Sequence, residues 1–216
     1  LIRVGSMPLA RTFLLPAAIN RISTLKPEIR VDVLEGPYDD LLNRLLHGEL
    51  DLLIGALRDP APSSDIQQEQ LLTSPISVVA RKQHPLAGRG TLTLDDLHGY
   101  PWVVPREGTP ARSLFNRLIA AQDPSALSGV IECSSQIVIR ELLLGSDRLT
   151  FISSHQIEHE QQEGILTVLN IDMPPVERPI GITTRKDWQP TTTQRLFISI
   201  VRSLAQSLAR TTRIVR

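Results

Sequence analysis

The first part of the chain alternates short apolar segments with amphipathic ones. Apolar residues at 14–25 recur at the spacing of one helix face, and those at 39–48 do the same. Residues 29–33 alternate apolar and polar side chains, which is the period of a half-buried strand. Short apolar runs at 2–4 and 52–55 indicate two further strands. The order strand, helix, strand, helix, strand predicts parallel strands with helices packed across them.

Ligands of such sheets bind at the carboxyl ends of the strands, where loops lead into helix starts. Residues 6–8, 36–38 and 55–57 follow the three predicted strands, so they fall along one edge of the sheet. Exposed backbone N–H groups at the first of these loops favour a carboxylate or another acceptor. We expect five residues of these loops to bind a ligand: Ser6, Met7, Pro8, Tyr38 and Ala56.

Two of these residues have an alternative role that the sequence leaves open. Ser6 has the side chain of a helix cap, so it either caps the following helix or contacts the ligand. Tyr38 follows Pro37 at the second helix start. Its ring and hydroxyl suit stacking and hydrogen bonding to a ligand, or else the ring packs on Pro37 at the surface.

The rest of the chain repeats the pattern of strand, loop and helix. Strands are predicted at residues 67–72, 76–81, 102–104, 130–132, 149–152, 165–171 and 179–184. Helices are predicted at residues 93–97, 110–122, 135–145, 156–162 and 191–210. Several of these helices follow a residue suited to capping, namely Thr93, Thr109, and Ser153 or Ser154.

The pattern divides into two blocks that predict two lobes. Residues 1–75 form the first block and residues 76–179 the second. The last strand and the long last helix, in residues 180–216, need a sheet to cover, and the first block can supply it. We therefore expect an α/β protein of two Rossmann-like lobes, joined by two crossover strands. A cleft between two such lobes is a usual place for a small ligand.

The second block offers polar groups at equivalent strand ends. Thr109 stands at the start of one predicted helix, and Ser134 and Ser135 stand at the start of another. Each is suited to capping its own helix, and together they are suited to closing on one small polar molecule from the second lobe. Arg106 lies near the first of these turns, where it either pairs with an acidic ligand or stays solvated.

Composition narrows the class of protein. The 216 residues include 23 Lys and Arg and 23 Asp and Glu, and a neutral balance argues against this chain binding DNA by itself. The hydrophobic share of 41% is normal for a soluble protein, and no apolar run approaches the roughly 20 residues that span a bilayer. No signal peptide is visible, and the single cysteine excludes an intrachain disulfide. These features favour a reducing cytoplasm and no membrane contact.

The sequence shows no convincing catalytic or metal site. Cys133 lacks the local signature of a cysteine enzyme, with His155 or His159 as its only conceivable base, and is interpreted as a small buried apolar residue. The two histidines are spaced to share a metal, but no third ligand follows, so we interpret them as surface residues. His84 is interpreted as a turn residue. We expect no cofactor and no metal.

Several ordered motifs give the chain a resemblance to a known family. They are VGSMPLARTFLLPAAINR, LKPEIRVDVLEG, LLHGELDLLIGAL, ARKQHPLAGRGTLTLDDL, PREGTPARSLFNRLI, IECSSQ followed by LLLGSDRLTFIS, and RPIGITTRKDW. Together they resemble the effector-binding domain of LysR-type transcriptional regulators over essentially the whole chain. The GTPARS, IECSS and LLLGSD segments are most similar to regulators of a galactose-binding protein and of protocatechuate catabolism.

The resemblance implies properties that the residues alone do not show. It implies a type-II periplasmic-binding-protein-like fold, with an inducer between regulatory lobe I (1–75 and 180–216) and regulatory lobe II (76–179). It implies an N-terminal winged helix-turn-helix, absent from this sequence, through which the whole protein binds DNA. It also implies a homodimer or homotetramer that pairs through the helices at 14–25 and 135–145. The inducer is expected to be a sugar or an aromatic or other organic acid.

Three hypotheses follow for the function. The leading one is an inducer-sensing, dimer-forming domain of a transcription regulator. The alternative is a free solute-binding protein of a transport system, which shares the fold and predicts a signal peptide upstream. The third is an enzyme on the same scaffold, such as a deaminase or dehydratase, which requires an activated nucleophile or acid that the sequence does not show.

Overall fold

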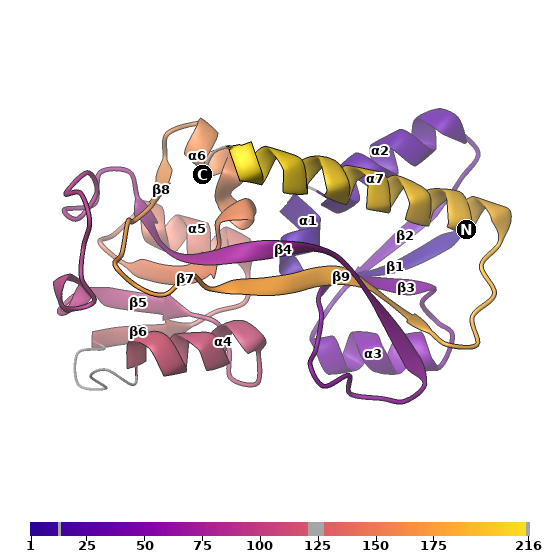
Figure 1. Cartoon of the computed structure of the whole chain (residues 1–216), viewed down its shortest axis with the longest axis horizontal. Helices are drawn as coiled ribbons and strands as arrows, with labels where there is room; N and C mark the ends of the chain where they lie inside the picture. The colour runs from indigo at the N-terminus through magenta and orange to yellow at the C-terminus, as the bar shows by residue number, and fades with distance from the viewer. Residues whose placement is uncertain (13, 121–127, 215–216) are drawn as a thin grey trace. The chain divides into compact units, whose positions relative to one another are not determined.

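The structure, a computed structural model, describes residues 1–12, 14–120 and 128–214, which form two compact units (Figure 1). Unit 1 consists of Leu1–Ser74 and Arg178–Arg216, and unit 2 of Pro75–Glu177. The chain therefore passes twice between the units, once within strand β4 (Ile66–Arg81) and once at the start of strand β9 (Glu177–Arg185). Each unit has its own apolar clusters, and β9 and β4 are neighbours in one strand order that runs through both units.

In unit 1 the strand order is β2, β1, β3, β9, followed by the first part of β4. Strand β1 (Ile2–Ser6) pairs in parallel with both β2 (Val31–Glu35) and β3 (Leu52–Ala56). Strand β9 returns from the distant end of the chain and pairs antiparallel with β3, matching Ala56 to Ile180. The three parallel strands therefore end along one edge, as the alternation of strands and helices predicts.

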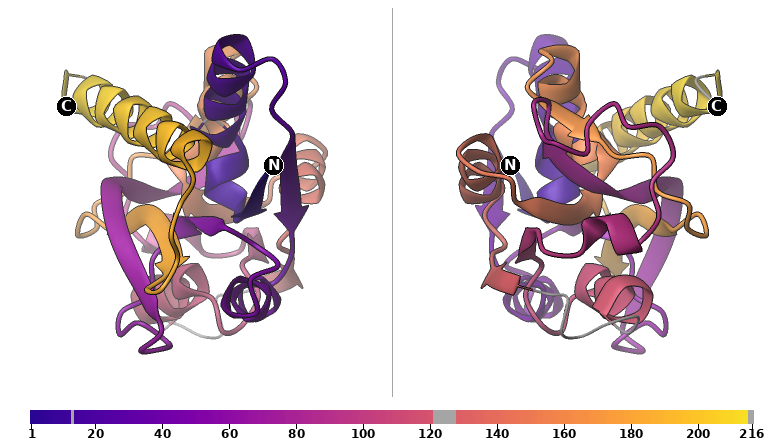
Figure 2. Two further views of the ribbon diagram at one scale, coloured as in Figure 1. Left: turned by 90° about the vertical axis from the view of Figure 1, so that its right-hand side faces the viewer. Right: turned by 90° about the vertical axis from the view of Figure 1, so that its left-hand side faces the viewer.

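Helices cover both faces of this sheet. On one face α2 (Leu14–Leu25) lies beside α7 (Thr192–Ile214), with the short α1 (Pro8–Thr12) leading into α2, and on the other face lies α3 (Tyr38–Leu46) (Figures 1 and 2). Leu14, Ile22 and Phe197 belong to the core under α2 and α7, whereas Leu41, Leu45 and Leu53 belong to the core under α3. The stripes that the sequence predicts as buried therefore face the sheet.

Helix α3 shows how local sequence sets the ends of an element. Asp39 and Asp40 lie in its first turn, where negative charge complements the helix dipole. The helix stops before Gly48, whose φ of 77° is a left-handed conformation that residues with a Cβ rarely adopt. The predicted end of this helix at Gly48 is confirmed.

The sheet of unit 2 has the strand order β4, β7, β5, β6, and β8 (Leu166–Val168) also pairs with β4. Strand β7 (Leu149–Ser153) is antiparallel to β4 and parallel to β5 (Pro101–Val104). Strand β6 (Ser128–Glu132) is parallel to β5. The core packs Trp102 edge-on against Phe115, with 5.1 Å between ring centroids.

Three helices accompany this second sheet. Helix α4 (Pro110–Phe115) continues as a π-helix over Asn116–Ala120, and the predicted end of this helix at Gln122 lies outside the described residues. Helix α5 (Gln136–Leu144) follows β6, and α6 (Glu158–Gln162) follows β7. Short 3-10 helices occupy Asp95–Leu97 and Ser154–Ile157.

Two expectations for strands are wrong in their extent. The segments at 67–72 and 76–81 are one strand, β4, which runs through Pro75, the residue just before pairing with β7 begins at Ile76. The strand expected at 165–171 shortens to β8, and Ile171 makes only an isolated bridge to Leu92.

Two expectations for caps are also wrong. Ser153 precedes the 3-10 helix that leads into α6, but its side chain makes no capping bond, and Ser154 lies inside that helix. At the predicted helix 93–97, the Thr93 hydroxyl is expected to accept a capping bond. Instead the Asp96 carboxylate accepts hydrogen bonds from both the N–H (2.8 Å) and the hydroxyl (2.9 Å) of Thr93. The predicted caps at Thr109 and Ser135 are confirmed.

Candidate functional site

The carboxyl ends of the parallel strands in unit 1 bring the three predicted loops to one edge. Ser6, at the end of β1, is matched in register with Glu35 of β2 and with Ile54 of β3. Residues 6–8, 36–38 and 55–57 leave the sheet from these neighbouring positions. The pairing thus places the first five predicted site residues along one edge of a single unit.

Ser6 and Met7 are both buried. This differs from the expectation of a capping serine followed by exposed backbone N–H groups. Ser6 is fully buried, and its hydroxyl has no hydrogen-bond partner among the described residues, so the interpretation of Ser6 as a helix cap is wrong. The N–H of Met7 donates to Ile54 O at 3.1 Å, extending the sheet instead of facing solvent. The Met7 side chain packs against Gly55, where an added Cβ would meet Met7 atoms at 2.5 Å. Pro8 is half-buried and begins α1.

Tyr38 begins α3 and lies beneath the side chain of Arg58. The guanidinium of Arg58 lies over the Tyr38 ring, 4.3 Å from its centroid, which is a cation–π contact. The Tyr38 hydroxyl is buried and makes no hydrogen bond of ordinary distance and angle among the described residues, although the Arg58 side chain lies close enough to interact with it. Burial raises the pKa of Tyr38, and the charge of Arg58 opposes that rise. Tyr38 also packs against the cluster that contains Met7 and Leu41.

Arg58 is held in place through its backbone. The side-chain amide of Gln68 accepts from Arg58 N at 2.9 Å and donates to Arg58 O at 2.8 Å. This two-point bond fixes the chain just after Ala56, the half-buried last residue of β3. Burial lowers the pKa of Arg58, against the opposing influence of Tyr38. No pattern in the sequence singles out Arg58, which directly follows the loop at residues 55–57.

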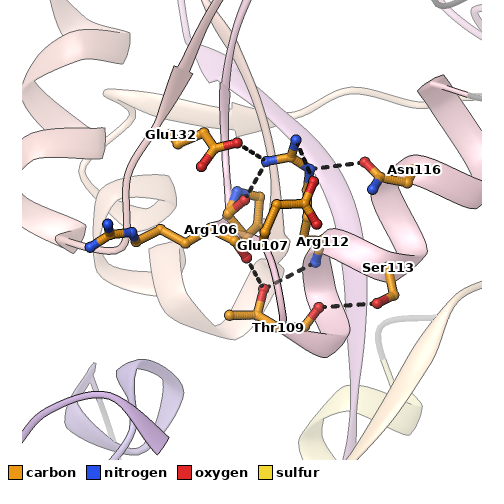
Figure 3. Close-up of polar contacts among 8 residues, drawn as sticks. Arg106, Glu107, Thr109, Arg112, Ser113, Asn116 and Glu132 are labelled. Atoms are coloured by element: carbon orange, nitrogen blue, oxygen red, sulfur yellow. Dashed lines mark hydrogen bonds and ion pairs between the residues drawn. The ribbon is translucent and has the colours of Figure 1, made fainter.

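In unit 2, the loop before α4 is organised around Arg112 (Figure 3). Its guanidinium donates to Asn116 Oδ1 at 2.9 Å and to Pro105 O at 3.0 Å, and forms ion pairs with Glu107 at 2.8 Å and Glu132 at 2.7 Å. The Arg112 side chain is only 14% exposed. These contacts tie the end of β5, the loop and the end of β6 to the helix.

Thr109 is part of the same loop and its hydroxyl is already engaged. It accepts from Arg112 N at 3.2 Å, as a helix cap does, and donates its proton to Arg106 O at 2.8 Å. With its only proton donated, this hydroxyl can meet a ligand only as an acceptor. The side chain of Arg106 is exposed, consistent with the solvated alternative.

The serines at the start of α5 are exposed. The hydroxyl of Ser135 accepts from Val138 N at 3.5 Å and retains its own proton for another partner. Ser134 is also exposed. Cys133 is half-buried and packs against the cluster of Val103, Ile139 and Leu143, so it is less enclosed than the sequence suggested. A binding role for these serines stays a prediction.

Comparison with known proteins identifies the kind of domain that carries these loops. A family model described as the LysR substrate binding domain matches residues 1–206. The chain belongs to the LysR substrate-binding domain family. The predicted resemblance and fold class are confirmed.

Curated relatives of this LysR domain are named as transcriptional regulators. The regulator GalR of Pseudomonas putida is 39% identical over 184 residues, which are 85% of this chain and 46% of GalR. The regulator PcaQ of Agrobacterium fabrum is 29% identical over 207 residues, which are 96% of this chain and 67% of PcaQ. The chain therefore spans about half the length of the first relative and two thirds of the second.

Solved structures share the fold of this LysR domain. The regulatory domain of CcmR from Synechocystis, solved in complex with 2-PG, has a TM-score of 0.79 and 22% identity, covering 96% of this chain and 98% of that one. The reduced OxyR regulatory domain of Pseudomonas aeruginosa has a TM-score of 0.73 and 20% identity, covering 94% and 95%.

Three histidines of this LysR domain, His84, His155 and His159, are interpreted from the sequence as turn or surface residues. His84 is buried, its Nδ1 accepts from Leu86 N at 3.1 Å, and its Nε2 lies 3.2 Å from Asp147 O. This confirms His84 as a turn residue. His155 is half-buried, and burial lowers its pKa, so its interpretation as a surface residue is wrong, whereas His159 is exposed. Within residues 1–12, 14–120 and 128–214, no three His, Cys, Asp or Glu side chains are grouped to hold a metal ion.

Unit 1 also has a pocket away from the strand-end loops. A shallow pocket of about 450 Å³ in unit 1 is lined by Arg3, Asp32, Arg44, Glu49 and neighbours, and none of the predicted ligand residues lines it. This pocket is open and its lining carries both signs of charge, so it is less suited to enclose a ligand than the strand-end loops. No helix in the described part of the chain is both long and apolar enough to cross a membrane.

Proposed function

We propose that this chain is the inducer-sensing domain of a LysR-type transcription regulator. Its family membership over residues 1–206 and the names of its relatives support this function. The observation in the structure that carries the proposal is a pair of buried hydroxyls, of Ser6 and Tyr38, that make no hydrogen bond of ordinary distance and angle among the described residues. Buried polar groups are almost always hydrogen-bonded, so hydroxyls of this kind at the ends of parallel strands favour a polar ligand.

We propose that the inducer contacts the strand-end loops of unit 1 through Ser6, Met7, Pro8, Tyr38 and Ala56. Met7 and Pro8 supply apolar surface beside the two hydroxyls, because Met7 packs between Gly55 and the cluster under α3. In unit 2 we propose Thr109, Ser134 and Ser135 as further contacts, of which Ser135 is the best placed to donate. The ligand is a sugar or an aromatic or other organic acid.

Binding without chemistry is the activity we propose for this domain. A ligand shifts the population of two protein states only as far as its affinity for them differs, and this needs no catalytic group. No nucleophile with an adjacent base is found among the described residues that the site contains. The whole protein would bind DNA through a helix-turn-helix outside this sequence, and would act in the cytoplasm.

We also propose that the domain pairs with a second copy. Helix α5 exposes 74% of Ile137 and 46% of Val138, and α2 exposes 53% of Leu25. Large apolar side chains on the surface of two helices are typical of an interaction face. Their positions agree with pairing through α2 and α5 in a homodimer or homotetramer.

The experiment that tests this function is a melting screen of the purified chain with D-galactose and a panel of aromatic acids. We expect at least one compound to raise the melting temperature saturably. The variant Tyr38→Phe keeps the ring under Arg58 but removes the hydroxyl, so we expect roughly tenfold weaker binding of that compound. Without ligand, we expect the stability of this variant to be unchanged or higher, because a buried hydroxyl that makes no ordinary hydrogen bond is removed.

The matched control is Ser23→Ala, which removes an exposed hydroxyl on α2. It should leave both melting and binding unchanged. If no compound changes the melting temperature, or if Tyr38→Phe binds as tightly as the wild type, the proposed site is wrong. A signal peptide in place of a helix-turn-helix in the complete gene would instead identify a free solute-binding protein.

A further inference from the structure

Helix α5 of unit 2 has three sides with different surroundings. Its inner side packs Ile139 and Leu143 into the apolar cluster beside β7 (Figure 1). Its outer side exposes 74% of Ile137, a residue that we propose for pairing with a second copy. The third side carries Gln136 and Arg140, which are four residues apart and therefore lie on one face of the helix. Both side chains reach the segment that follows β7.

The contact between Gln136 and this segment is a reciprocal pair of hydrogen bonds. The side-chain N–H of Gln136 donates to Gln156 O, and the side-chain N–H of Gln156 donates to Gln136 Oε1 at 3.2 Å. Gln156 is only 6% exposed and belongs to the 3-10 helix Ser154–Ile157, directly after β7. A two-point bond fixes orientation as well as position, and breaking it is costly because Gln156 is buried.

An ion pair adds a second contact one turn further along α5. Arg140 Nε lies 3.5 Å from the carboxylate of Glu160 on α6, whose side chain is 15% exposed. Arg140 also pairs with Glu141 at 3.0 Å, and its own side chain is 40% exposed, so solvent weakens both ion pairs. The pair of Gln136 and Gln156 is therefore the stronger directional contact between α5 and the segment after β7.

This segment lies at the edge of the sheet where we propose ligand contacts in unit 2. Strand β7 is parallel to β5, and β5 is parallel to β6, so the three strands end along one edge. Thr109 follows β5, Ser134 follows β6 and Ser154 follows β7. The glutamine pair thus joins this edge to the helix that exposes Ile137.

We propose that the pair of Gln136 and Gln156 is a positioning contact, which holds Ile137 and Val138 at the angle that self-association of the chain requires. The inference rests on the proposed pairing through α5 and adds the internal contact that controls it. Gln156 is covered within its own chain, so it acts on a second copy only through α5. Because each of two pairing copies needs α5 in this position, loosening α5 in both copies acts twice on the association constant.

The test measures self-association of the purified chain by sedimentation over a range of concentrations. Gln136→Leu and Gln156→Leu should each lower the association constant by about fivefold or more. The double variant should lower it by less than the product of the two single effects, because both changes remove the same contact. Gln162→Leu makes the same change at an exposed glutamine of α6 and should leave association unchanged.

Hydrogen exchange separates this role from a loss of folding. It requires only Gln136→Leu, a change at a half-buried side chain, so it also decides if Gln156→Leu does not fold. In the wild type, raising the protein concentration should slow exchange of the amides at 154–157, because association acts back on this segment through the pair. In Gln136→Leu this slowing should be lost, while the buried strand β5 stays protected.

The outcomes distinguish this inference from the proposed function. Unchanged association in both glutamine variants, or slowing at 154–157 that persists in Gln136→Leu, overturns the positioning contact. Single effects that multiply in the double variant overturn it too, because the two residues then act independently. If Ile137→Glu leaves association unchanged, or if the wild type does not associate, pairing through α5 is wrong and the positioning contact with it. The melting screen then still decides on inducer sensing.

Discussion

At the scale of single residues, His84 shows how neighbours decide the chemistry of a side chain. Because Nδ1 accepts a hydrogen bond from the Leu86 N–H, the ring is neutral and its own proton is on Nε2, directed at Asp147 O. Burial lowers the pKa of His84, an effect that the bond to Asp147 O opposes. Arg81, which pairs with Asp147 at 2.6 Å, adds a positive charge nearby that also disfavours protonation.

This predicts a loss of stability in mild acid. The folded pKa of His84 is below its unfolded value, so as pH falls below about 6.5 the unfolded chain takes up the proton first and unfolding becomes easier. Urea unfolding measures the free energy of unfolding at pH 7.5 and at pH 5.5. The decrease between the two should be smaller in His84→Asn than in the wild type, and the asparagine amide oxygen can replace Nδ1 as the acceptor. The control His98→Asn changes an exposed histidine. If the free energy of unfolding falls equally in the wild type and both variants, His84 is not the source of the acid sensitivity, and His155 would account for it.

Arg112 is a second example, because its contacts hold the loop before α4 in place. We predict that Arg112→Lys costs about 1–2 kcal/mol of unfolding free energy, because lysine cannot reproduce the bonds to Asn116, Pro105 and the two glutamates at once. Glu107 is 64% exposed, so Glu107→Gln should cost no more than about 0.5 kcal/mol. Chemical denaturation measures both. Equal costs would mean that the ion pair with Glu107 alone holds the loop.

At the scale of elements, β4 and β9 approach each other more closely than side chains allow. A Cβ added at Gly181 would lie 1.9 Å from Glu69 O of β4. We predict that Gly181→Ala destabilises the chain by at least about 1–3 kcal/mol, because backbone has to move to admit the methyl group. Gly36→Ala is the control, since its Cβ would meet Leu41 at an ordinary 3.8 Å. Thermal unfolding of the two variants at similar temperatures would contradict this close crossing.

Elements with a strong local signal could be predicted from the sequence. The helix stripe at Leu14–Leu25, the end of α3 at Gly48 and the caps at Thr109 and Ser135 all follow from local spacing and side-chain chemistry. Strand β4 could not be predicted whole, because a proline in a strand is tolerated only where pairing leaves its missing N–H unused. That condition depends on strands β7 and β9, which are distant in sequence.

The candidate site was predictable only in part for the same reason. The alternation of strands and helices places residues 6–8, 36–38 and 55–57 at one edge, and the register of β1 with β2 and β3 confirms this edge. The place of Arg58 over Tyr38 could not be predicted, because Gln68, which binds its backbone, comes from β4, ten residues further along the chain. The burial of Ser6 and the engaged hydroxyl of Thr109 likewise depend on neighbours that local sequence does not reveal.

At the scale of the whole molecule, association of two copies has a direct test. We predict that Ile137→Glu lowers the association constant of the purified chain, because it places a charge on the apolar side chain that α5 exposes most. Sedimentation over a range of concentrations measures this. Gln161→Glu on α6 is the exposed control. Unchanged association in Ile137→Glu would show that copies pair through another face.

The measurement that tests the account most directly is equilibrium binding of small organic acids and sugars to the purified chain, with recovery of the bound compound afterwards. The account predicts saturable binding of at least one compound, weakened by Tyr38→Phe, and recovery of that compound unchanged. Absence of binding by every compound, or recovery of a chemically altered one, would contradict a domain that senses a ligand without transforming it.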